Sequence, residues 1–142
     1  MRALSIRQPF AELILRGMKT IEYRSRATHI IGERFWIYAA RGDAAKATGR
    51  TNRGIWSRDL AVPGEPLPPW MLELAEGLRL WKPGELPTGV IVGSAVIERC
   101  EPPSGDVASR SALFQWHIGG VERLGQPRKP VRHPQPVWFV PF

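Results

Sequence analysis

The stretch with the most evident chemistry is RGMKTIEYRSR, residues 16–26, which gathers Lys19, Glu22 and Arg24. Arg offers a planar fork of donors to phosphate or a base edge, a carboxylate accepts from an exocyclic amine, and Lys neutralises phosphate. These three residue types therefore predict a nucleic-acid site. The alternative is a structural cluster of ion pairs that fixes the turn into a strand, since such networks are common and not themselves functional.

A short strand is expected to carry this group, because Ile21 and Tyr23 alternate with Glu22 and Arg24. The alternation predicts that Ile21 and Tyr23 face the core while the charged side chains line a cleft beside it. Lys19 would stand at the entrance of the strand.

A first strand is predicted at ALSIRQ, residues 3–8. If it neighbours the charged strand, then Ser5, Arg7 and Gln8 reach the same cleft. Trp36 and Trp116 offer flat surfaces on which an unpaired base can stack, a contact worth about 1–3 kcal/mol per base. Considered individually, however, each of these tryptophans is more readily explained as a core residue than as a stacking surface.

The remaining pattern is mostly strand. Pro9 opens a helix with Phe10, Leu13 and Ile14 on one face, and Gly17 ends it. Further strands are predicted at 34–40, 88–101, 112–124 and 134–142, and a second helix at 68–81, after a basic and turn-rich excursion at about 42–69. The strand at 88–101 is apolar on both faces and should be the most buried. Several short strands with few helices predict a small barrel or half-barrel.

At 142 residues the chain suits a single domain, 1–142, built around one core. Lys and Arg number 20 against 13 Asp and Glu, and the net charge of +7 favours a polyanionic partner, with nucleic acid first. Two further basic stretches, the excursion and RLGQPRKPVRH at 123–133, are either ordinary solvated surface or a phosphate track extending from the cleft.

Cys100 is the only cysteine, so no internal disulfide is possible and a cytoplasmic location is expected. No apolar run has the length of a membrane span, and the start lacks a secretory signal, so no membrane partner is expected. His29, His117, His133 and Cys100 lack the spacing of metal ligands. We therefore expect neither a metal nor a cofactor.

GMKTIEYR fits G-x-K-x-x-E-x-R, the signature of ASCH domains, at Gly17, Lys19, Glu22 and Arg24. The chain resembles this family over nearly its whole length outside the excursion. LSIRQPFAELIL is similar to its opening strand and helix, RFWIYAA and TGVIVGSAVI to its next strands, and FQWHIGGVERLGQPRKPVRHPQPVWFVP to its closing stretch. The resemblance implies an α+β fold, a small PUA-like β-barrel with flanking helices, whose cleft binds RNA and in some branches a modified base.

The resemblance also implies site residues and leaves catalysis open. Trp116 in FQWH occupies the matching family position, which favours it as a stacking surface, and His117 beside it is a further candidate contact. Some relatives are amidohydrolases acting on N(4)-acetylcytidine, with Lys19 matching their nucleophile, yet Glu22 stands where they have a threonine. A Lys beside Glu22 tends to stay protonated and is a poor nucleophile.

Three functions therefore remain. The first is an RNA-binding module. The second is a hydrolase acting on RNA or a modified nucleoside, as a ribonuclease or amidohydrolase, in which Lys19 and Glu22 would be catalytic and His117 a general acid or base. The third is a protein-interaction domain whose charges are structural.

Overall fold

Six strands and one helix make up the regular structure of the described residues, which are 1–8, 10–43, 86–103 and 113–142 of a computed structural model. In chain order they are β1 (Ala3–Gln8), α1 (Phe10–Leu15), β2 (Ile21–Arg24), β3 (Arg34–Asp43), β4 (Val90–Glu101), β5 (Phe114–Arg128) and β6 (Trp138–Phe139).

The described part is a curled, mostly-strand half-barrel with one short helix, so the predicted α+β barrel with flanking helices is confirmed in its strands and hardly in its helices. Only α1, six residues long, is helical there. The helix predicted at 68–81 and nearly all of the excursion predicted at 42–69 lie outside the described residues. The strand predicted at 112–124 is also longer than expected, because β5 runs on to Arg128.

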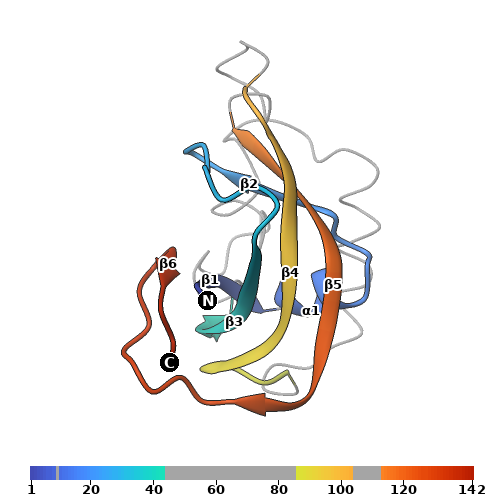
Figure 1. The fold of residues 1–142 in the computed structure, drawn as a ribbon. Helices are drawn as coiled ribbons and strands as arrows, with labels where there is room; N and C mark the ends of the chain where they lie inside the picture. The colour runs from blue at the N-terminus through green and yellow to red at the C-terminus, as the bar shows by residue number, and fades with distance from the viewer. Residues whose placement is uncertain (9, 44–85, 104–112) are drawn as a thin grey trace, which may run out of the picture.

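All six strands join one sheet in the order β2-β5-β4-β3-β1-β6. Every neighbouring pair is antiparallel except β1 and β3, which pair in parallel from Ala3 opposite Trp36 onward. The ladder between β4 and β5 shifts register at three places, and such bulges increase the twist and bend of a sheet. The sheet accordingly curls into a half-barrel, with β2 crossing one end of β5 and β6 at the opposite edge (Figure 1).

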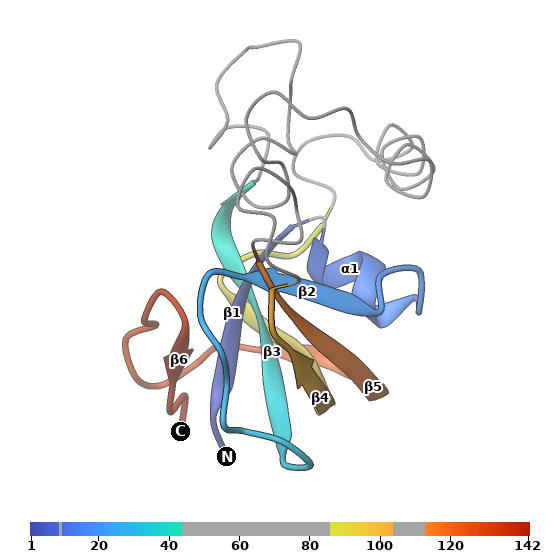
Figure 2. The same ribbon diagram turned by 90° about the horizontal axis from the view of Figure 1, so that it is seen from above.

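The core fills the inside of this curl. Leu4 of β1, Ile37 of β3 and Ala95 of β4 belong to the main cluster, and α1 adds Leu13 and Ile14 from beside the sheet (Figure 2). The helix forms because its apolar residues recur at a spacing of three to four and therefore share a face.

The strand at 88–101, predicted to be the most buried, is covered on both faces in its first half but not over its whole length. β4 is buried without interruption from Ile91 to Ala95. Val92 and Ala95 pack in the main cluster, whereas Ile91 packs in a second cluster with Tyr38 and Phe139. β4 is therefore the central strand around which the sheet curls.

Candidate functional site

A left-handed glycine connects α1 to the charged strand. Gly17 has a φ of 72°, which costs glycine little and other residues more. Its N–H donates to the carbonyl of Ile14 at 3.0 Å, and the N–H groups of Met18 and Lys19 both donate to the carbonyl of Leu13. These bonds end the helix and turn the chain so that Lys19 lies directly before β2.

Lys19, Glu22 and Arg24 form one ionic cluster. Lys19 Nζ lies 2.7 Å from Glu22 Oε2, and Arg24 Nη2 lies 3.0 Å from Glu22 Oε1. The Lys19 ammonium also donates to the backbone carbonyl of Ile21, and its side chain is only 3% exposed. Glu22 therefore has a cation on each carboxylate oxygen.

The carboxylate of Glu22 is held ionised. Its burial acts to raise the pKa, but the positive charges of Lys19 and Arg24 outweigh that effect and lower the pKa below its ordinary value. A carboxylate has room for about four hydrogen bonds on its two oxygens, so Glu22 can accept another donor beside these partners.

Glu22 is more deeply buried than a residue on the cleft face of β2 was expected to be. It pairs with the buried Trp116 of β5 and is only 8% exposed, whereas Tyr23 is half-buried and packs against the main core cluster, as predicted. The ion pairs explain this burial, because burying a carboxylate becomes tolerable once two cations compensate its charge.

Arg24 reaches across to β1. Its Nη2 donates to the backbone carbonyl of Ser5 at 3.0 Å, and its guanidinium carbon lies 5.8 Å from the centre of the Trp116 ring. The Arg24 Nε is buried and has no hydrogen-bond partner among the described residues. Arg24 thus connects the two strands that flank the opening of the half-barrel.

A cleft of about 430 Å³ lies at this opening. The volume falls within the range of about 300–1,000 Å³ that is usual for ligand sites. Its polar lining consists of Ser5, Arg7, Glu22, Arg24, Ser25 and Arg41, and its apolar lining of Ile6, Phe10, Tyr23, Ala40, Leu113 and Pro136. Three guanidinium groups and one carboxylate therefore meet in one hollow.

Four of the predicted site residues, Ser5, Arg7, Glu22 and Arg24, do line this cleft. Lys19 lies behind them, in contact with Glu22 and near the rings of Phe10 and Tyr23 at 6.0 and 5.8 Å. Lys19 was predicted to contact a ligand directly, but it is not part of the cleft lining. The geometry instead gives Lys19 the role of fixing the charge and position of Glu22.

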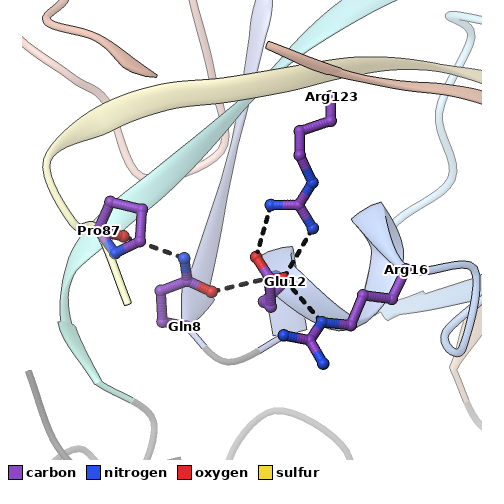
Figure 3. Close-up of polar contacts among 5 residues, drawn as sticks. All are labelled: Gln8, Glu12, Arg16, Pro87 and Arg123. Carbon is purple, nitrogen blue, oxygen red and sulfur yellow. Dashed lines mark hydrogen bonds and ion pairs between the residues drawn. The ribbon is translucent and has the colours of Figure 1, made fainter. Parts of the chain in front are cut away.

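Gln8 lies elsewhere and supports α1 (Figure 3). Its Oε1 accepts from the backbone N–H of Glu12 at 3.1 Å, and its Nε2 donates to the carbonyl of Pro87 at 3.0 Å. The Glu12 carboxylate accepts from both Arg123 of β5 and Arg16, directly after α1, at 2.7 to 3.0 Å. These contacts therefore anchor the helix to β1, to β5 and to the backbone at Pro87.

The predicted aromatic contacts are also outside the cleft lining. Trp116 is only 2% exposed, stacks on Trp138 with ring centres 5.9 Å apart, and donates its indole N–H to the carbonyl of Arg26. Trp138 thus covers one face of the Trp116 ring, and the Arg24 guanidinium lies 5.8 Å from its centre. Trp36 packs against the second cluster and makes an edge-to-face contact with Phe142, the ring centres 6.4 Å apart.

His117 likewise points away, because neighbouring residues of a strand face opposite sides. Its Nε2 lies 3.3 Å from Glu101 Oε2, and Arg99 holds the other oxygen of Glu101 at 3.0 Å. His117 therefore lies on the face of β5 opposite the one that Trp116 shares with Glu22, its predicted catalytic partner.

Arg41 and Ser25 also line the cleft, although neither was predicted as a site residue. Arg41 directly precedes the excursion predicted at about 42–69. The parallel pairing of β1 and β3 sets Arg7 opposite Ala40 and so brings Arg41 to the cleft. No local pattern in the sequence predicts that β1 and β3 pair in parallel. Ser25 could have been found more easily, because it directly follows Arg24, the last residue of the signature.

The described part of the chain offers neither a metal site nor a membrane-spanning helix. No group of three or more His, Cys, Asp or Glu side chains there can hold a metal ion. Within the same residues no helix is long and apolar enough to span a membrane. Cys100 is a free, half-buried thiol.

Comparison with known proteins identifies the family. The family model of the ASCH domain matches residues 4–117, from the second residue of β1 to the first third of β5. A comparison with curated proteins gives no match. The resemblance seen in the signature is therefore confirmed by a match that covers most of the chain.

Proposed function

The chain belongs to the ASCH domain family, which is associated with RNA binding, and on that premise we propose that its cleft binds single-stranded RNA by enclosing one unpaired nucleotide. The observation that carries the proposal is the joint presence of Arg7, Arg24 and Arg41 with an ionised Glu22 in the same hollow. Guanidinium groups bind phosphate, and a carboxylate accepts from the amine of a base.

The size of the hollow supports a single nucleotide. A cleft of about 430 Å³ is large enough for a base with its sugar and has no room for a duplex. RNA recognition commonly uses such a base, splayed out of its stack and read along its edge. A modified base fits the same description, provided that it keeps a donor for Glu22.

The position of Lys19 favours binding over nucleophilic catalysis. Its ammonium is buried, is paired with Glu22 at 2.7 Å and also bonds to the carbonyl of Ile21. A lysine attacks only as a free amine, and this pairing stabilises the charged form. No feature of the cleft favours the hydrolase or the protein-interaction function over RNA binding.

The test measures the affinity for a fluorescently labelled single-stranded RNA by anisotropy at low and high salt. We expect binding that weakens as salt rises, because phosphate contacts release counterions. Arg41→Gln is expected to weaken binding without unfolding the protein, since Arg41 is exposed. Arg99→Gln is the matched control, because Arg99 is 62% exposed and lies outside the cleft lining.

Two results would overturn the proposal. One is a wild-type protein that binds neither RNA nor a nucleotide at low salt. The other is an Arg41→Gln variant that binds as well as Arg99→Gln does.

A further inference from the structure

The segment that joins β5 to β6, residues 129–137, is called here the return segment. It belongs to a stretch that contains no acidic residue, since no Asp or Glu occurs between Glu122 and Phe142. Its cations Lys129 and Arg132 are exposed, as is His133 between Arg132 and Pro134. Neither Lys129 nor Arg132 has an ion pair in the part of the chain that the structure describes.

Backbone bonds hold the return segment against the rest of the fold. The N–H groups of Val131 and Arg132 donate to the carbonyl of Pro141 at 2.8 and 3.1 Å. At its other end the carbonyl of Val137 accepts from the N–H of Ser5 at 2.9 Å. The segment also contains Pro130, Pro134 and Pro136, and proline limits backbone freedom. A surface held in this way loses little conformational entropy when it binds.

The return segment reaches the cleft at Pro136, which is part of the cleft lining. Pro136 is the fourth residue after Arg132, so their backbones lie at most about 14 Å apart. A strand of RNA that leaves the cleft over Pro136 therefore comes within reach of Arg132 and Lys129. Arg128, at the end of β5, lies 4.3 Å from the ring of Phe142 and so helps to hold the C-terminal residues.

We propose that the return segment is a second binding surface, on which Lys129 and Arg132 neutralise backbone phosphates of the RNA whose nucleotide occupies the cleft. This inference rests on the proposed function of the cleft. Contacts to phosphate position a strand without reading its sequence. The return segment therefore adds affinity for longer strands and leaves the choice of base to the cleft.

The test compares two labelled single-stranded RNAs, a trinucleotide that fills only the cleft and a dodecamer that extends past it. Kd is measured over a series of salt concentrations for the wild type, Arg132→Gln and Lys129→Gln/Arg132→Gln. Each lost phosphate contact reduces the salt slope by about 0.7 and weakens binding about fivefold at 0.1 M salt. We expect these losses for the dodecamer and unchanged binding of the trinucleotide.

Arg99→Gln removes the same charge from a strand end outside the cleft and serves as the matched control. Unchanged circular dichroism and thermal midpoints show that each variant is folded. The inference is overturned, and the cleft proposal stands, if Arg41→Gln weakens both RNAs while Arg132→Gln behaves like Arg99→Gln. Both proposals fall if the wild type binds neither RNA.

A protein partner would give a different result. If polyglutamate displaces the dodecamer as effectively as unlabelled RNA does, the return segment recognises acidic protein instead, and the inference is wrong.

Discussion

Arg24 of β2 donates to the backbone carbonyl of Ser5 of β1 at 3.0 Å, although three strands lie between β2 and β1 in the sheet. This bond bridges the opening of the half-barrel through a side chain where no backbone ladder exists. The same guanidinium lines the cleft. The Arg24 side chain therefore both stabilises the fold and forms part of the binding cleft.

Replacing Arg24 should reduce stability as well as binding. Arg24→Gln loses the bonds to Ser5 and Glu22 and the contact with Trp116, and hydrogen bonds to charged groups contribute about 1.5–3 kcal/mol each at most. Because the Arg24 side chain is 22% exposed, solvent screening weakens these interactions. We therefore expect the free energy of unfolding, measured by urea denaturation, to decrease by about 2 kcal/mol. Arg99→Gln should change it by less than about 0.5 kcal/mol. An equal effect of both variants would contradict a bridging role.

Glu22 should make the protein sensitive to acid. Its pKa is lowered in the folded state, so its contribution to stability is complete above the unfolded value of about 4.3 and is lost as the pH falls through the folded pKa. We expect the urea midpoint of the wild type to decrease below about pH 4.3. Glu22→Gln should start from a lower midpoint and decrease less. Glu33→Gln, at an exposed position, should follow the wild type, and a Glu22→Gln variant with the wild-type pH dependence would refute the assignment.

Lys19 should act through Glu22. Removing one partner of a buried ion pair costs about 3–5 kcal/mol, so Lys19→Met should strongly reduce the free energy of unfolding. In the double variant Lys19→Met/Glu22→Gln the buried carboxylate is gone as well, and part of the stability should return. A double-mutant cycle measures this coupling. Independent, additive losses would show that the two groups do not form a functional pair.

The buried, paired ammonium of Lys19 also predicts an absence of deacetylation. Wild-type protein incubated with N(4)-acetylcytidine should leave the nucleoside unchanged, because a protonated amine cannot attack the acetyl carbonyl. Liquid chromatography of the nucleoside checks this. If the wild type releases cytidine and Lys19→Ala does not, the protein is an amidohydrolase and this prediction is wrong.

The cleft should distinguish bases by their amines. Glu22 accepts hydrogen bonds only, so oligocytidine, whose N4 is a donor, should bind more tightly than oligouridine, by about 1–3 kcal/mol for a well-formed contact. Glu22→Gln can also donate and should narrow the difference between the two. Anisotropy measurements at constant salt test this, and equal affinity of the wild type for both oligomers would show that Glu22 does not read the base.

Local patterns predicted the elements well and their mutual placement less well. Gly17 and the apolar residues of α1 were enough to define a helix and its end, and alternation was enough to find β2. Alternation could not reveal that Glu22 is buried, because the rule places charge outside unless its partners are known. Lys19 and Arg24 lie on either side of Glu22 in the sequence, but only the folded structure shows that all three side chains are buried against one another.

Contacts between distant residues account for the remaining differences. Trp116 was predicted as a stacking surface from its motif, but Trp138 covers it, and that contact depends on how far the sheet curls. Arg41 joins the cleft only because β1 and β3 pair in parallel. Gln8 follows Arg7 in the strand, and its bonds to α1 and Pro87 remove it from the cleft.

The pairing of β1 with β6 has a consequence for synthesis of the protein on the ribosome. Ala3 and Leu4 find their partners Phe139 and Trp138 only after the more than 130 residues between them have also been translated. Until then the nascent β1 keeps an open edge, which invites pairing with another chain. Such late closure makes folding slow and exposes the intermediate to aggregation.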